Sequence, residues 1–282
     1  MTSDEVSGNL GPGYGGRKDY SKLGNCIGLE YAFGYYMGEA IDSQVLLINY
    51  APGGQSLYRN FRPPSAGLPD PMPLKDGPNK TKIPTTGDDF DGQYRGMVSY
   101  VHEVLGDLKK RFPACVDKDG FEIAGLVWFQ GYNDMIDGGK PVAEYGKNLI
   151  CLIKDLRQEF KVPQMKVVVG VIGVNGVKNE IGKMGDIRNQ MRSMDKVAGF
   201  DGNVKAVESA PLLSPEVFAL KTAGWLNKDR NLKESPITPE EQAMLSRATS
   251  NLGFHYFGEG RFFILLGKSF AETMLDLRNT KK

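Results

Sequence analysis

The chain alternates short apolar runs with longer segments in which apolar residues recur every three or four positions. Uninterrupted apolar runs rich in β-branched residues are typical of strands buried on both faces of a parallel sheet. Segments with apolar residues at helical spacing are typical of helices that pack against such a sheet. The apolar runs predict parallel strands at residues 45–50, 123–129, 167–173 and 204–210.

The helical spacing recurs between and around these runs. Thr238 is expected to start one helix, because this N-cap residue is followed by proline and two acidic residues. The alternation of strands and helices predicts one α/β domain over residues 26–282, a three-layer α/β/α sandwich with a parallel sheet. We expect the polar, Gly-rich residues 1–25 to be poorly structured. The other expected helices are residues 27–40, 97–110, 143–160, 185–197 and 259–276.

Two long stretches, residues 59–95 and 211–236, show neither pattern. Loops of this length in a compact domain are usually functional or disordered. The first stretch follows the apolar run at 45–50, and open α/β sheets bind ligands at the carboxyl ends of their strands. We therefore interpret residues 59–95 as part of the rim of a substrate site, with a disordered insertion as the alternative.

Composition and charge narrow the classes of partner. The 282 residues carry a net charge of +1, so we expect no nucleic-acid partner. No apolar run is long enough to span a bilayer, so we expect no membrane partner, and the start of the chain lacks the apolar core of a signal peptide. The odd number and wide spacing of Cys26, Cys115 and Cys151 predict buried thiols rather than disulfides or a zinc site.

Histidine is the usual general base at neutral pH, and the chain has two. His102 lies within a helical pattern, and we expect it to pack on the helix or face solvent. His255 lies in NLGFHYFGEG, a Gly-flanked loop before the last expected helix. Loops carry function more often than helix interiors do, so His255 is the candidate general base.

Polar residues also follow the expected strand at 123–129. The stretch GLVWFQGYNDM places Gln130, Gly131, Asn133 and Asp134 just beyond this strand. An Asn side chain at that position can donate a hydrogen bond to a developing oxyanion. Gly and Asn also favour ordinary turns, so a simple strand-to-loop turn is the alternative.

A third candidate segment is APGGQSLY, residues 51–58. Gly53 and Gly54 offer backbone N–H groups that can form an oxyanion hole or only a turn. Ser56 carries a hydroxyl group, but a serine needs a base before it can attack. From these residues alone, Ser56 is either a nucleophile or a turn residue.

Together these segments resemble the SGNH hydrolases, and more closely their sialate O-acetylesterase-like branch of carbohydrate acetylesterases. The resemblance rests on QGYND, on NLGFHYFG and on YAFGYYMGEAIDSQVLLINYAPGGQSLYRNFRPPSAG, and it covers nearly the whole chain. It implies that His255 is the general base. It also implies that the oxyanion hole is built from Gly54 or Gly53 together with the Gly131 and Asn133 block.

The resemblance makes Ser56 part of a Gly-Gly-x-Ser-Leu turn and leaves the first strand and nucleophile block of the family without a match. The rival interpretation makes Ser56 the nucleophile, and it needs another strand between residues 59 and 122, where no good apolar run occurs. The serines ahead of the first expected helix follow no apolar strand; they are Ser3, Ser7 and Ser21.

The histidine block also departs from the family pattern. Leu252 stands three residues before His255, where the family often has an aspartate. The sequence therefore leaves open whether His255 acts in a dyad with the serine or is oriented by another carboxylate, such as Glu208 or Asp134.

The resemblance implies a serine-type carbohydrate O-acetylesterase that hydrolyses acetyl esters of a small-molecule or glycan substrate, with no metal and no organic cofactor. We expect Gln130, Asp134 and Arg62 to contribute to substrate binding. The alternative is a non-catalytic carbohydrate-binding remnant, or a truncated fragment of such an esterase. A dinucleotide-binding domain does not fit, because no G-x-G-x-x-G joins a strand to a helix.

Overall fold

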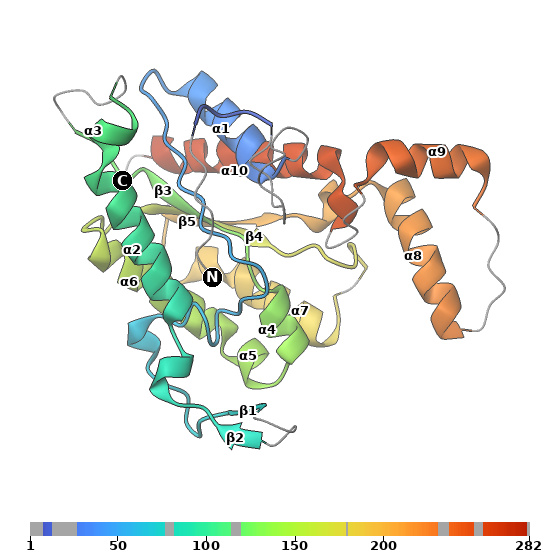
Figure 1. The fold of residues 1–282 in the computed structure, drawn as a ribbon, viewed down its shortest axis with the longest axis horizontal. Coiled ribbons are helices and arrows are strands. Elements are labelled where there is room, and N and C mark those ends of the chain that lie inside the picture. The colour runs from blue at the N-terminus through green and yellow to red at the C-terminus, as the bar shows by residue number, and fades with distance from the viewer. Residues whose placement is uncertain are drawn as a thin grey trace. The chain divides into compact units, whose positions relative to one another are not determined.

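Figure 1 shows the fold of the chain in the computed structural model. The chain forms two compact units. The structure describes residues 8–12, 27–76, 82–113, 120–178, 180–230, 237–250 and 256–280. The first unit comprises Met1–Leu47, Gly170–Asn179 and Val207–Asn279, and the second comprises Ile48–Val169, Glu180–Ala206 and Thr280–Lys282.

The described residues include a three-stranded parallel sheet in the order β3-β4-β5. Strand β3 (Gly125–Trp128) pairs in parallel with β4 (Lys166–Val171) along its whole length. Strand β5 (Val204–Glu208) lies on the other side of β4, and the two strands start together where Val167 N–H donates to Asn203 O at 2.8 Å. The α/β class with a parallel sheet is therefore confirmed, as are three of the expected strands.

Residues 45–50 form no strand, and the sequence prediction is wrong there. None of the six residues is buried, and Leu46 is 40% exposed. Tyr50 is instead fixed through its side chain, since its hydroxyl group donates to Gln93 Oε1 at 2.8 Å and its ring packs edge-on against Phe61. The prediction assumed burial on both faces of a sheet, and this apolar run does not have it.

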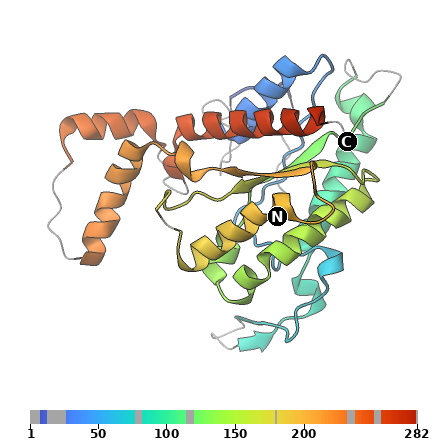
Figure 2. The same ribbon diagram turned by 180° about the vertical axis from the view of Figure 1, so that it is seen from behind.

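In the second unit, one helix agrees closely with the predicted apolar spacing and another differs from it. Helix α6 (Tyr145–Glu159) buries Tyr145, Leu149, Ile153 and Leu156, as the spacing predicted, and lies beside α7 (Gly182–Arg192) (Figure 2). The expected helix at 97–110 begins earlier and breaks in two. The helices are α2 (Gly92–Gly106), α3 (Leu108–Arg111), α4 (Tyr132–Asp137), α5 (Lys140–Ala143), α6 (Tyr145–Glu159) and α7 (Gly182–Arg192).

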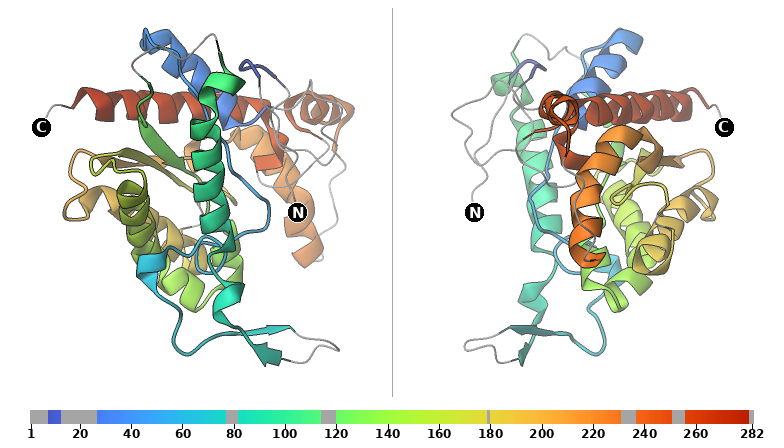
Figure 3. Two further views of the ribbon diagram at one scale, coloured as in Figure 1. Left: turned by 60° about the vertical axis from the view of Figure 1, so that its left-hand side comes forward. Right: turned by 90° about the vertical axis from the view of Figure 1, so that its right-hand side faces the viewer.

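The long stretch from residue 59 to residue 95 contains little regular structure. Its strands β1 (Leu74–Asp76) and β2 (Lys82–Pro84) form a short antiparallel hairpin, which lies beyond the start of α2 (Figure 3). Phe61 and Phe90 are buried within it. These two residues anchor the stretch in the protein interior, although Leu68 and Leu74 are exposed, and its role as the rim of a substrate site stays a prediction.

In the first unit, α1 (Leu29–Ala40) lies against α10 (Gly260–Asn279), as Figure 1 shows. The two helices approach closely at Gly267, where an added Cβ would come within 2.2 Å of the Leu29 carbonyl oxygen. Phe270 of α10 is fully buried. The apolar stripe of α10 therefore packs as predicted, and glycine permits the close contact.

The stretch from residue 211 to residue 236 was expected to be irregular, but it contains helix α8 (Pro215–Arg230). Proline at the first position and Ser214 just before it favour a helix start, and Glu259 accepts a hydrogen bond from Ser214 N–H at 3.2 Å. The sequence prediction missed α8 because its apolar residues form no stripe at helical spacing.

Helix α9 (Pro239–Ala248) starts as predicted. Thr238 and Glu241 form a capping box in which each side chain accepts a hydrogen bond from the other residue's N–H.

None of the described helices is both long and apolar enough to cross a membrane. Cys151 is a free, half-buried thiol, whereas Cys26 and Cys115 lie outside the described residues.

Candidate active site

The segment GGQSLY forms a turn that is held by its own polar groups. Ser56 O accepts hydrogen bonds from the N–H groups of Asn60 and Phe61, both at 3.0 Å. Asn60 Oδ1 in return accepts from Ser56 N–H at 2.9 Å. Ser56 Oγ donates to the same Asn60 oxygen and accepts from Arg59 N–H, each at 3.3 Å. Ser56 is only 4% exposed, so its hydroxyl group is used inside the turn.

The second segment, QGYND, leads from β3 into α4. Gly131 stands just before the helix with φ of 151°, a value that favours glycine. A Cβ there would lie 2.4 Å from Met191 Cε, the movable end of that side chain, so the backbone conformation is the main reason for glycine. Asp134 follows in the first turn of α4 and is completely buried.

Asp134 joins the two segments, although its partners lie 76 and 77 positions away in the chain. Its Oδ2 accepts from Leu57 N–H at 2.9 Å, and its Oδ1 accepts from Tyr58 N–H at 2.8 Å. Gln130 Nε2 donates to Oδ2 at 2.8 Å. Burial raises the pKa of Asp134, while these three hydrogen bonds act in the opposite direction. We call this arrangement the Asp134 clamp.

Gln130 and Tyr145 extend the clamp. Gln130 Nε2 also donates to Gln55 O at 3.0 Å. Tyr145, which is fully buried, donates from its hydroxyl group to Gln130 O at 2.5 Å and accepts from Trp128 Nε1 at 3.2 Å. Burial raises the pKa of the Tyr145 phenol well above its usual value. Gln130 Oε1 is buried and accepts no hydrogen bond within the described residues.

The predicted oxyanion groups lie beside the clamp, and the N–H groups of Gly53 and Gly54 donate to no group among the described residues. Gly54 directly precedes Gln55, has φ of 73°, and has open space where a Cβ would be. Gly53 is equally open. Asn133 is half-buried, and its side chain makes no hydrogen bond to the part of the chain that the structure describes. The oxyanion role of these residues stays a prediction.

Arg62 has a structural environment. Its guanidinium group is buried, donates to the carbonyl oxygens of Gly67 and Tyr58, and pairs with Glu144 at 3.4 Å. These bonds use its three nitrogens to hold the chain just after the GGQSLY turn. The predicted contact of Arg62 with substrate stays a prediction.

The structure describes the two carboxylates that could orient the predicted base, Asp134 and Glu208, but not the base itself. His255 and Leu252 lie outside the described residues. The carboxylate of Asp134 is occupied by Leu57, Tyr58 and Gln130. Glu208 ends β5 and is exposed.

Sequence reasoning missed two residues that shape this site. Asn60 fixes the turn around Ser56, and Tyr145 fixes the backbone of Gln130. Tyr145 belonged to a helical apolar pattern, which predicts burial but not the direction of a hydroxyl group. An Asn four residues after a turn serine carries no recognisable signal.

Comparisons with known proteins address the family. The model of a family described as carbohydrate esterase, sialic acid-specific acetylesterase, matches residues 17–215. The match includes GGQSLY and QGYND and ends before His255. No curated protein matches the chain.

An X-ray structure of a protein from Arabidopsis thaliana is 20% identical, with a TM-score of 0.37. That similarity covers 65% of this chain and 52% of the plant protein, so the chain spans about half of the length of that protein. The family match, in contrast, extends over more than half of the chain and agrees with its parallel sheet. The chain therefore belongs to the sialic acid-specific acetylesterase family of carbohydrate esterases and has the α/β fold of SGNH type that the sequence predicted.

Proposed function

We propose that the chain is a carbohydrate O-acetylesterase that holds the acetyl carbonyl of its substrate between Gly54 and Asn133. The Asp134 clamp carries this proposal, because it fixes the GGQSLY turn against the QGYND segment. Both candidate donors lie on the clamped segments and are not used within the described chain. Membership of the family supports an acetylated sugar as the substrate class.

The proposed role of the clamp is preorganisation. Ester hydrolysis develops negative charge on the carbonyl oxygen, and donors that already point at that oxygen stabilise the transition state. Gln130 is held through its backbone by Tyr145 and through its side chain by Asp134. Removal of one oxyanion donor lowers kcat by about 10²–10³-fold.

In the proposed reaction a serine hydroxyl attacks the acetyl carbon while a base takes its proton. The base then protonates the departing sugar oxygen, and water releases acetate from the acyl-enzyme in the same way. The resemblance implies His255 as this base. We assign Ser56 to the frame of the turn, because its hydroxyl group is buried and bonded to Asn60 and Arg59. The attacking serine is left unassigned.

Acetate release from O-acetylated sialic acid and from an acetylated neutral sugar tests the proposal. Asn133→Ala should lower kcat by about 10²–10³-fold. Asp137→Ala is the matched control, because Asp137 is exposed on the same short helix. Absence of acetate release from both substrates would overturn the esterase proposal, and equal rates for the two variants would remove Asn133 from the oxyanion hole.

A second candidate function is binding of acetylated sugars without hydrolysis. It is favoured by one observation, namely that the serine of the GGQSLY turn has its hydroxyl group engaged inside the turn. Labelling with a fluorophosphonate, followed by peptide mapping, separates the cases. No labelling together with saturable sugar binding supports the second candidate. Labelling that persists in Ser56→Ala supports an esterase with another serine, and labelling lost in that variant makes Ser56 the nucleophile.

A further inference from the structure

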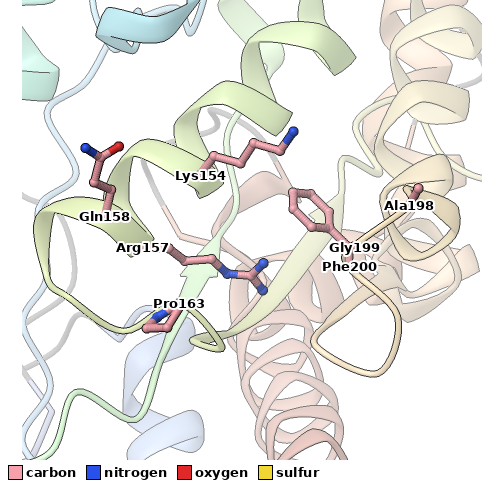
Figure 4. Close-up of a pocket in the computed structure, with 7 residues that line it drawn as sticks. All are labelled: Lys154, Arg157, Gln158, Pro163, Ala198, Gly199 and Phe200. Carbon is pink, nitrogen blue, oxygen red and sulfur yellow. The ribbon is translucent and has the colours of Figure 1, made fainter.

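The second unit has a pocket close to the starts of strands β4 and β5 (Figure 4). Its volume is about 320 Å³. It is formed by the last turns of α6, by Pro163 ahead of β4, and by the loop of Gly199 and Phe200 ahead of β5. The pocket thus lies where strands β4 and β5 begin, whereas QGYND follows the end of β3.

A buried cation faces this pocket. Arg157 is 7% exposed, and its Nε and Nη2 donate to Met165 O at 3.2 Å and 2.8 Å. Its guanidinium lies over the Phe200 ring, 4.9 Å from the centroid. Nη1 donates to no group within the described residues, and no acidic residue lines the pocket.

Partial burial of a positive charge without an anion is unfavourable. Burial accordingly lowers the pKa of Arg157 from its usual value, although a guanidinium stays charged at neutral pH. The carbonyl oxygen of Met165 satisfies one edge of the group. An anion in the pocket would satisfy the other edge and compensate the charge.

A second cation lies beside the first. Lys154 is three residues earlier on α6, so its side chain projects from the same side of the helix as Arg157. Figure 4 shows both side chains extending toward Phe200. Lys154 is exposed and forms no ion pair with any described residue. The pocket therefore presents two positive groups and no acidic one.

Apart from Gln158, which is polar and exposed, the rest of the lining is apolar. Pro163 and the Phe200 ring flank the cations. Gly199 has φ of 86°, and an added Cβ would meet no atom within 4 Å. A water molecule occupies about 30 Å³ in the liquid, so the pocket has room for more than a single oxyanion. Its volume falls at the lower end of the usual range for small-molecule sites.

We propose that this pocket binds a phosphate monoester of a small apolar or aromatic molecule. The phosphate lies between Arg157 Nη1 and the Lys154 ammonium, and the organic part packs on the exposed Pro163, because the Phe200 ring is 1% exposed and lies under Arg157. A phosphate monoester dianion matches two cations, whereas a carboxylate matches one, and charge-assisted hydrogen bonds to such oxygens are strong. The inference does not depend on the proposed esterase function.

Calorimetric titration of the full chain with phenyl phosphate at low ionic strength tests the proposal. We expect saturable binding that Lys154→Gln weakens about tenfold, since about 1.4 kcal/mol separates tenfold affinities. Lys147→Gln is the matched control, because Lys147 is exposed on the same helix outside the pocket. The Lys147→Gln variant should bind phenyl phosphate with the same affinity as the wild type. Inorganic phosphate should bind more weakly than phenyl phosphate because it lacks the ring.

Three results would overturn the proposal: no saturable binding of phenyl phosphate, equal affinities of the Lys154 and Lys147 variants, or equally tight binding of benzoate. Asn133→Ala should bind phenyl phosphate as the wild type does. Loss of binding in that variant would place the phosphate at the candidate active site instead.

Discussion

Two aspartates hold the same turn by different physical means. Asp134 accepts hydrogen bonds from the backbone N–H groups of Leu57 and Tyr58 and is completely buried. Asp89 pairs with the guanidinium of Arg59 at 3.2 Å and with Lys75 Nζ at 2.5 Å, and its side chain is partly exposed. Burial raises the pKa of Asp134, whereas the hydrogen bond from Lys75 is the main cause that lowers the pKa of Asp89 to about 2.

The difference shows which end of the turn is rigid. Backbone donors have fixed positions, so Asp134 sets the position of the chain beside QGYND. Long charged side chains such as Lys75 and Arg59 adapt to many geometries, and exposed ion pairs of this kind weaken as salt is added. The oxyanion groups that we propose lie at the end that Asp134 holds.

Asp134→Ala should have the largest effect on stability. It leaves the buried N–H groups of Leu57 and Tyr58 without acceptors, and each such group costs about 1–3 kcal/mol. Removal of a buried charge offsets part of this loss, so we expect the free energy of unfolding in urea to fall by about 2–5 kcal/mol. Asp89→Ala should have a smaller effect, because its charged partners become hydrated. If Asp134→Ala and Asp89→Ala lose the same free energy of unfolding, the two aspartates do not hold the turn by different means.

Tyr145→Phe sharpens the comparison at the buried end. The change removes the hydroxyl group between Trp128 Nε1 and Gln130 O, and we expect a loss of about 1–3 kcal/mol. Tyr35→Phe is the control, since Tyr35 is exposed. If both variants unfold at the same urea concentration as the wild type, the Tyr145 bonds do not stabilise the clamp.

Ser56→Ala tests the turn between the two aspartates. Loss of the hydroxyl bonds to Asn60 and Arg59 should lower the free energy of unfolding by about 0.5–1.5 kcal/mol. Thermal and urea unfolding both measure this loss. A gain in stability would contradict the structural role, because it would show that the hydroxyl group is a strained or costly feature of the folded chain.

The pH dependence of stability should have opposite signs at the two aspartates. The raised pKa of Asp134 means that its contribution to folding is greatest at low pH and falls as pH rises from about 4 through that pKa. The lowered pKa of Asp89 means that its contribution is present above about 4 and is lost as pH falls toward about 2.

Asp134→Asn and Asp89→Asn, compared with the wild type by urea unfolding at several pH values, measure these two contributions. The deficit of Asp134→Asn should shrink as pH rises, and that of Asp89→Asn should disappear near pH 2. Curves of the same sign would refute the assignment of burial to one residue and ion pairing to the other.

The sequence predicted those parts of the fold whose burial follows a regular period. The valines of β4 are completely buried, and α6 buries one apolar face, as expected. The same logic failed at residues 45–50, where an apolar run is not buried, and at α8, where a helix lacks an apolar stripe. The period of apolar residues predicts which positions are buried. It does not predict that residues 45–50 stay out of the sheet or that residues 215–230 form a helix.

The candidate site was predictable as two separate segments but not as a joined unit. The residue types of QGYND and GGQSLY indicated polar groups beside a strand and a turn. The clamp between them depends on Asp134 meeting Leu57 across 77 positions, and a single sequence carries no signal for such a contact. The engagement of Ser56 by Asn60 is likewise a matter of side-chain geometry.

The most direct test measures acetate release from an O-acetylated sugar by the wild type, Ser56→Ala and Asn133→Ala under the same conditions. Our account predicts that the wild type and Ser56→Ala release acetate at similar rates, and that Asn133→Ala is slower by about 10²–10³-fold. Loss of activity in Ser56→Ala with an intact fold, or full activity in Asn133→Ala, would contradict it.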